Sequence, residues 1–166
     1  QAKNLGLDVM VMNFSNEAWA IEYENETIMS GLRSEHVKEA AQVVSQYCDF
    51  IAIRAFASLT DQKRDEEEVV LRKFAAFASV PIINMESATA HPLQALADGL
   101  TIDEQVTVKQ PKIVLSWAPH PKALPHAVAN SFIGLMNHTK ADFVITHPEG
   151  YDLNSGIVGN HKVEYN

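Results

Sequence analysis

Residues 80–98 read VPIINMESATAHPLQALAD, and this stretch decides the fold. The apolar run at 80–85 predicts a short buried strand, and the small and polar residues after it predict a loop. An apolar helix then begins at His91-Pro92, because proline suits the first helical position and keeps the residue before it out of the helical region. A buried strand followed closely by a helix is typical of a parallel α/β sheet.

The same alternation continues on both sides of this stretch. Gly6 predicts the end of a helix, and Ser34 predicts the N-cap of another. The remaining elements are predicted from apolar runs and helical spacing: strands at 8–14, 48–56, 112–118 and 142–147, and helices within 35–47, 58–79 and 126–139. We therefore predict an α/β fold of parallel sheets with helices on both faces.

A polar gap at 105–111 follows the long helix that begins at His91. It is the predicted boundary between two lobes, 1–105 and 106–166. A chain of 166 residues suffices for one good core or for parts of two small lobes. Because the sequence starts without a methionine and stops without a tail, we expect it to be a piece of a larger protein.

Composition excludes several classes of function. Lys and Arg number 13 against 21 Asp and Glu, and the net charge of −8 argues against non-specific binding to nucleic acid or anionic membranes. A single cysteine, Cys48, allows no disulfide within the chain. No apolar run approaches the roughly 20 residues of a membrane span, and the N-terminus lacks a signal-peptide layout. We predict a cytoplasmic protein.

Candidate site residues follow from the position of the strands. In open α/β sheets, ligands bind beyond the carboxyl ends of the strands. Arg54 ends CDFIAIR, Glu86 and His91 follow VPIINM, and His120 follows KIVLSWA. We therefore expect these four side chains along one edge.

Each candidate also has a plain structural explanation. His91 and Gln94, one helical turn apart, would grip a polar ligand that carries a carbonyl and an amino group, or would only cap the helix and contact solvent. Arg54 would bind an anion or form an ion pair. Glu86 would bind a substrate amine or the N–H groups of its own loop.

Two further residues leave similar alternatives open. His120 lies between prolines in WAPHPKALP, which either hold it as a site residue or only shape the chain. Trp19 lies in a polar segment and would pack in the core or against a partner subunit.

Motifs for other chemistries are missing from the sequence. It has no H-x-x-x-H pair and no pair of cysteines, so we predict no metal site. It also lacks G-x-S-x-G, G-x-x-x-x-G-K-[ST] and G-x-G-x-x-G, which argues against a serine hydrolase, a P-loop NTPase and a dinucleotide oxidoreductase. We predict that no cofactor is needed.

HPLQALAD resembles the H-P-x-Q-x-L-A-D motif of the aspartate and ornithine transcarbamylases. Further segments resemble the transcarbamylases that act on N-acylated ornithine: EAWAIEYENETIMSG (17–31), SEHVKEAAQVV (34–44), IAIRAF (51–56), NMESATAHPLQALADGLTI (84–102), SWAPHPKALPHAVANSF (116–132) and FVITHPEGYDL (143–153). The resemblance covers nearly the whole chain. It implies a transcarbamylase-like fold of two lobes, with a knot formed through the prolyl loop 119–125.

The resemblance also implies an activity. The enzyme would transfer the carbamoyl group of carbamoyl phosphate to the δ-amine of an N-acylated ornithine in arginine biosynthesis. Arg54, His91 and Gln94 would hold carbamoyl phosphate, with Arg54 and His91 as the catalytic pair that polarises its carbonyl oxygen. Glu86 and His120 would contact the acylornithine. Trp19 would reach carbamoyl phosphate in a neighbouring subunit, which implies a homotrimer.

Two departures from the family pattern stand out. The Ser-Thr-Arg-Thr type phosphate loop is absent from the sequence, and the resemblance places it just before residue 1. The sequence would then be the middle part of a subunit and inactive alone. Ser34 stands where this subfamily has proline or glutamate to separate succinyl from acetyl substrates. Serine lacks the glutamate charge that would repel a succinyl carboxylate, which slightly favours N-succinylornithine over N-acetylornithine.

Two other hypotheses remain open from the sequence. One is a plain ornithine carbamoyltransferase, against which the prolyl loop and the surroundings of Glu86 argue. The other is a non-catalytic α/β module that binds a ligand or a partner and has lost the phosphate loop.

Overall fold

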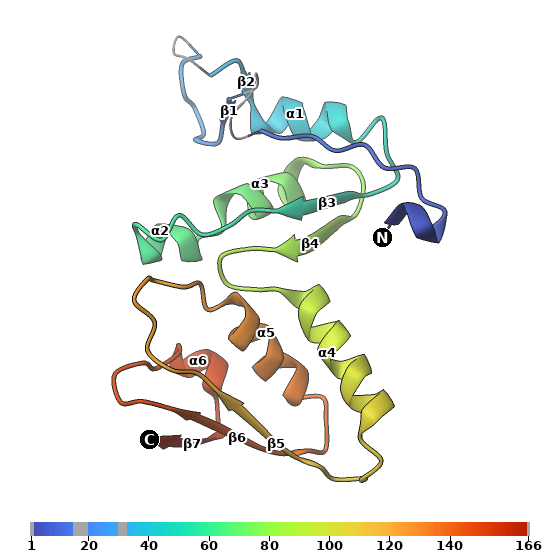
Figure 1. Ribbon diagram of the computed structural model, residues 1–166. Coiled ribbons are helices and arrows are strands. Elements are labelled where there is room, and N and C mark those ends of the chain that lie inside the picture. The colour runs from blue at the N-terminus through green and yellow to red at the C-terminus, as the bar shows by residue number, and fades with distance from the viewer. Residues whose placement is uncertain (1, 15–19, 30–32, 166) are drawn as a thin grey trace.

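The strands of the described residues form three small parallel sheets (Figure 1). The structure, a computed structural model, describes residues 2–14, 20–29 and 33–165. Neighbouring strands in each sheet are parallel: β1 (Ile21–Glu22) with β2 (Glu35–His36), β3 (Ile51–Arg54) with β4 (Ile82–Glu86), and β5 (Lys112–Ser116) with β6 (Asp142–His147) and β7 (Lys162–Tyr165) in the order β5-β6-β7. The predicted parallel α/β class is confirmed.

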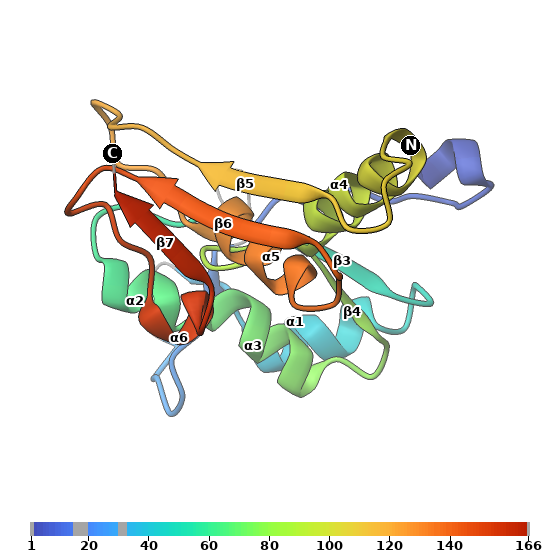
Figure 2. The ribbon, with the colours of Figure 1, turned by 90° about the horizontal axis from the view of Figure 1, so that it is seen from below.

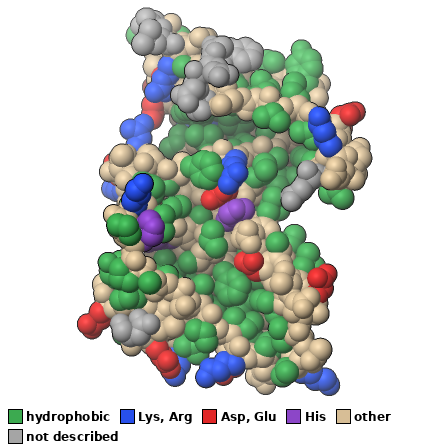
Figure 3. Space-filling view, in the orientation of Figure 1, with side chains coloured by type: hydrophobic (Ala, Val, Ile, Leu, Met, Phe, Trp, Pro, Cys, Tyr) green, Lys and Arg blue, Asp and Glu red, His purple; other side chains and the backbone are tan. Residues whose placement is uncertain are grey.

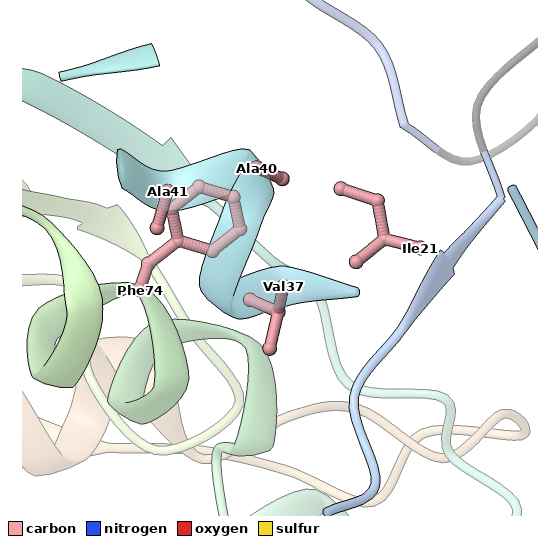
Figure 4. Packing of buried hydrophobic residues seen from close by; sticks show 5 residues of the cluster. All are labelled: Ile21, Val37, Ala40, Ala41 and Phe74. Atoms are coloured by element: carbon pink, nitrogen blue, oxygen red, sulfur yellow. The ribbon is translucent and has the colours of Figure 1, made fainter. Parts of the chain in front are cut away.

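The first hydrophobic cluster lies in the N-terminal half. Helix α1 (Val37–Val44) packs against α3 (Val69–Phe77), and the short helix α2 (Gln62–Glu66) precedes α3. Figure 4 shows the buried residues of this cluster, Ile21, Val37, Ala40, Ala41 and Phe74. Ile53 of β3 and Ile82 of β4 pack against it, so the two helices hold the sheet that carries Arg54 and Glu86.

A second cluster supports the C-terminal sheet. It joins α5 (Ala127–Met136) to β6 through Ile133, Met136, Phe143 and Ile145, with α6 (Ser155–Val158) beside them. Figure 2 shows α5 and α6 on the same side of this sheet. Helix α4 (Pro92–Gln105) packs against α5 and adds Ile102 to the cluster. The division into lobes 1–105 and 106–166, and the knot, stay predictions.

Two local predictions are wrong. The segment 8–14 forms no strand, and Val9, Met10 and Val11 are exposed. An apolar run becomes a strand only where a neighbouring strand takes up its backbone N–H and C=O groups. The N-cap of α1 is His36, whose Nδ1 accepts from the Lys38 N–H, because Ser34 lies before β2 and not at the helix start.

The predicted stop at Gly6 is confirmed in a tighter form. A 3₁₀ turn, η1 (Ala2–Leu5), precedes it, and Gly6 has φ of +83°, which suits glycine because it has no Cβ. No described helix is both long enough and apolar enough to cross a membrane.

Asp65 makes the loop after β3 sensitive to acid. Its carboxylate accepts from the backbone N–H groups of Ser58 and Leu59 at 2.8 and 2.9 Å, and the Ser58 bond above all lowers its pKa. Because the folded pKa lies below the unfolded one, this stabilisation is full above the unfolded pKa and is lost as pH falls through the folded value.

We therefore predict that Asp65→Asn destabilises the protein at pH 7 and that its deficit shrinks towards about pH 3. Urea unfolding of both proteins across this range measures the effect. Glu67→Gln, at an exposed position close by, is the control. A deficit that is constant with pH would contradict the assignment.

Candidate functional site

Arg54 and Glu86 meet at the carboxyl ends of β3 and β4. They are partners in the register of the sheet, immediately after an irregularity between Ile53 and Arg54. Nε and one terminal nitrogen of Arg54 donate to Oε2 of Glu86 at 3.0 and 2.8 Å. Glu86 is buried, and more than half of the Arg54 side chain, 55%, is exposed. The pair therefore has a buried acceptor and an accessible donor.

The guanidinium of Arg54 is fixed from a second direction. Its central carbon lies 4.5 Å from the centre of the Phe56 ring, a cation–π contact. Only two of its five N–H donors are used by Glu86, so the others remain available to a ligand. Arg54 is thus held in a defined orientation while some of its N–H donors stay available.

His91 both caps α4 and faces Glu86. Its Nδ1 accepts from the Gln94 N–H at 3.4 Å, so the neutral ring carries its hydrogen on Nε2. Nε2 lies 3.6 Å from Oε2 of Glu86, just beyond hydrogen-bond distance. The backbone N–H of His91 donates to Oγ of Ser131 on α5 at 2.7 Å. From the sequence, His91 would either cap the helix or face a ligand site. In the structure it caps α4 and its Nε2 also faces Glu86.

Donors from Arg54 and His91 therefore converge on one oxygen, Oε2 of Glu86. Figure 3 shows a basic, an acidic and a histidine side chain close together near the middle of one face, with hydrophobic side chains around them. Two donors directed at one point are suited to stabilise an oxygen that gains negative charge during a reaction. The N-terminus of α4 adds a favourable dipole for such a charge.

The side chains of Gln94 and His120 form their hydrogen bonds away from this group. The side-chain amide of Gln94 donates to Asp98 one turn along α4, at 2.8 Å. His120 follows β5, in a different sheet, and within the described chain its ring bonds only to the backbone of Lys122. Trp19 lies outside the described residues. Three of the four predicted edge residues thus come together, and His120 is not among them.

Several residues near the site were missed from the sequence. The contact of Phe56 with Arg54 could have been predicted, because Phe56 is two residues after Arg54 and residues two apart lie on the same side of an extended chain. Glu68 and Ser131 could not have been predicted, since they are respectively 18 residues before Glu86 and 40 residues after His91. Their contribution depends on how the chain folds, and no local spacing reveals it.

A surface hollow lies away from Arg54, Glu86 and His91. It has a volume of about 760 Å³ and is lined at the amino ends of β6 and β7 by residues that include Asn137, Asp142, His161 and Lys162. No predicted site residue lines it, and ligands of parallel sheets bind at the opposite ends of the strands. The described residues include no group of three or more His, Cys, Asp or Glu placed to hold a metal ion.

The comparison with protein families identifies the class. The family model for the carbamoyl-P binding domain of aspartate/ornithine carbamoyltransferase matches residues 2–104. The chain belongs to this family.

Individual relatives narrow the likeness. The chain is 49% identical to the N-succinylornithine carbamoyltransferase of Bacteroides thetaiotaomicron over 164 residues, which are 99% of this chain and 52% of that protein. It is 39% identical to the N-acetylornithine carbamoyltransferase of Xanthomonas campestris pv. campestris over 150 residues, 89% of this chain and 44% of the other. The chain thus spans about half the length of the curated relatives that it matches.

Solved structures agree with this fold. One is an N-acetyl-L-ornithine transcarbamylase with serine in place of a glutamate, complexed with carbamyl phosphate and N-succinyl-L-norvaline. It superposes with a TM-score of 0.87 at 34% identity and covers 99% of this chain and 53% of that one. An acetylornithine transcarbamylase complexed with acetylcitrulline gives a TM-score of 0.80 at the same 34% identity, over 90% and 48% of the two chains. The transcarbamylase-like fold is confirmed.

Proposed function

We propose that the full-length protein is a carbamoyltransferase that moves the carbamoyl group of carbamoyl phosphate to the δ-amine of an N-acylated ornithine. The observation that carries this proposal is that Arg54 and Nε2 of His91 lie together at Glu86, with three of the five Arg54 N–H donors left for a carbonyl oxygen beside Oε2. The family supports the donor substrate, and the relatives named for N-acylated ornithines support the acceptor.

The reaction requires a stabilised oxyanion. The δ-nitrogen attacks the carbonyl carbon, and the carbonyl oxygen gains negative charge. The carbon–oxygen bond to phosphate then breaks, and the departing phosphate takes up the proton that the nitrogen loses. Arg54 and Nε2 of His91 donate to the oxygen as it becomes charged. The chemistry needs no covalent intermediate on the protein and no cofactor. Fixing both substrates in the reacting geometry supplies much of the remaining acceleration.

Glu86 has a double role in this proposal. Oε2 orients Arg54 and faces His91, whereas Oε1 accepts no hydrogen bond within the described chain. We propose that Oε1 contacts the acylornithine. His120 would join it from the other lobe, and Gln94 would turn from Asp98 to carbamoyl phosphate when that ligand binds. Trp19 would reach a neighbouring subunit's carbamoyl phosphate in a homotrimer, and the enzyme would act in arginine biosynthesis in the cytoplasm.

We propose N-succinylornithine as the preferred acceptor. Ser34 is exposed and uncharged, and the residue before it, Arg33, has a half-exposed side chain that is bonded to Glu22 at 3.0 Å. An uncharged residue 34 suits a succinyl carboxylate, whereas a glutamate at this position would repel it. Two N-succinylornithine carbamoyltransferases are 49% and 47% identical to the chain, and four N-acetylornithine carbamoyltransferases are 37% to 39% identical to it.

The reaction is tested with the full-length gene product and carbamoyl phosphate. Ornithine, N-acetylornithine and N-succinylornithine are offered separately, and the carbamoylated product is followed by mass. Turnover of N-succinylornithine above N-acetylornithine supports the proposal. Turnover of ornithine alone would favour a plain ornithine carbamoyltransferase, and no turnover from folded protein would favour a module that only binds its ligand.

Ser34→Glu is predicted to shift the acceptor preference. The added carboxylate repels the succinyl carboxylate, so the ratio of kcat/KM for succinyl over acetyl substrate should fall about tenfold or more, as expected for one unfavourable charge contact of roughly 1.4 kcal/mol. Ser34→Gln adds a similar side chain without charge and serves as the control. If both variants keep the original ratio, residue 34 does not select the acyl group.

A further inference from the structure

The loop that joins Glu86 to His91 is held by a residue of another element. Oε1 of Glu68 accepts from both the backbone N–H and the hydroxyl of Thr89, at 3.1 and 2.7 Å, and also from the hydroxyl of Ser87. Three donors from a four-residue loop thus share one carboxylate oxygen. This oxygen replaces the water that the loop's polar groups would otherwise bind.

Glu68 occupies a backbone position that suits its side chain poorly. It lies between α2 and α3 with φ of +48° and ψ of +43°, in the left-handed region that favours glycine and asparagine. It is the N-cap of α3, yet its carboxylate makes no capping bond to that helix. The carboxylate is used by the loop instead. Backbone strain that persists together with a specific contact is typical of functional positions.

The opposite side of the loop is held by α5. The side-chain amide of Asn130 donates to the Thr89 carbonyl at 3.0 Å, and Ser131 accepts from the His91 N–H. The loop is therefore fixed between α3 and α5, with Glu86 at its start and His91 at its end. A shift of this loop changes the distance between Oε2 of Glu86 and Nε2 of His91.

We propose that Glu68 is a positioning residue for catalysis: by binding Ser87 and Thr89, it fixes the relative placement of Glu86 and His91. This inference rests on the proposed carbamoyl transfer at these two residues. Glu68 touches neither substrate, and it acts only through the loop. Misplacement of reacting groups by about 1 Å typically lowers a rate about a hundredfold, so loss of the carboxylate has a large effect at a distance.

Glu68→Gly separates this role from a contribution to folding. Glycine accepts a φ of +48° without strain, so the variant removes the carboxylate and the backbone strain together. In the full-length enzyme we expect kcat to fall about tenfold to a hundredfold while the thermal midpoint stays near that of wild type. Glu68→Gln keeps an acceptor oxygen in place and should recover most of the lost rate. Glu67→Gly, at the exposed preceding position, is the matched control.

Thr89→Val tests the route of the effect. It removes one of the bonds to Glu68, so its loss in kcat should not add to that of Glu68→Gly in the double variant. Additive losses would overturn the proposal, because they would mean that Glu68 and Thr89 contribute to kcat independently.

Amide hydrogen exchange provides a readout that does not depend on turnover. The Thr89 amide, which is bonded to Glu68, should exchange faster in Glu68→Gly than in wild type and Glu67→Gly. If Glu68→Gly shows faster exchange but an unchanged kcat, while His91 variants are inactive, the positioning role is overturned and the proposed carbamoyl transfer stands. Unchanged exchange would also overturn the positioning role. Failure of the proposed function itself appears separately, as absence of transfer by the wild-type enzyme.

Discussion

His91→Asn is expected to lower kcat by about a hundredfold to a thousandfold, the usual effect of removing one donor to an oxyanion. Asparagine is a good N-cap, so it can replace Nδ1 in capping α4 while its short side chain no longer extends to the position of Nε2. The free energy of unfolding should therefore change little. Steady-state kinetics together with urea unfolding separate the two roles of this histidine.

A matched control exists in the second half of the chain. His126 is the N-cap of α5 and makes no side-chain capping bond. His126→Asn is the same substitution at another helix start, so kcat should stay near the wild-type value. Equal losses of kcat in the two variants would indicate a general effect of the substitution and would contradict a catalytic role for His91.

Arg54→Met is expected to lower kcat/KM by about a thousandfold and to destabilise the protein. Activity falls because one of the two donors to the carbonyl oxygen is lost. Stability falls by about 1–3 kcal/mol because the buried Glu86 carboxylate loses both hydrogen bonds that Arg54 donates to it. Arg72→Met, at an exposed position of α3, is the control for loss of a positive charge.

A second substitution separates these two effects. In Arg54→Met/Glu86→Gln, the unpaired buried charge is gone, so stability should recover towards wild type while activity does not. If the double variant regained activity together with stability, the loss in Arg54→Met would be a folding defect, and Arg54 would have no direct part in transfer. Glu86→Gln alone is the reference, because Glu86 belongs to the proposed site, and thermal unfolding and kcat/KM of the three variants distinguish the two results.

The positions of Arg54, Glu86 and His91 were predictable from the sequence for a physical reason. Buried strands in a parallel sheet leave their carboxyl ends at one edge, and Pro92 fixes the start of the helix. Each of these signals lies within a few residues of the side chain that it places. The pairing of Arg54 with Glu86 then follows from strand register.

Other features depended on contacts between distant segments. The run 8–14 is as apolar as a strand, but the structure pairs it with none, and strand formation depends on the partner. The side-chain amide of Gln94 donates to Asp98, which belongs to the same motif, HPLQALAD. The motif alone does not show whether this amide binds Asp98 or a ligand. Glu68 stands in a run of three glutamates, and only the return of the chain at β4 distinguishes it from its neighbours.

We propose that donors of Arg54 and His91 bind the carbonyl oxygen of carbamoyl phosphate. A crystal structure of the full-length gene product with carbamoyl phosphate tests it most directly. We expect this oxygen within about 2.7–3.1 Å of a terminal nitrogen of Arg54 and of Nε2 of His91, with Glu86 still orienting Arg54. Carbamoyl phosphate bound with its carbonyl oxygen away from both residues would show that they do not form the oxyanion site.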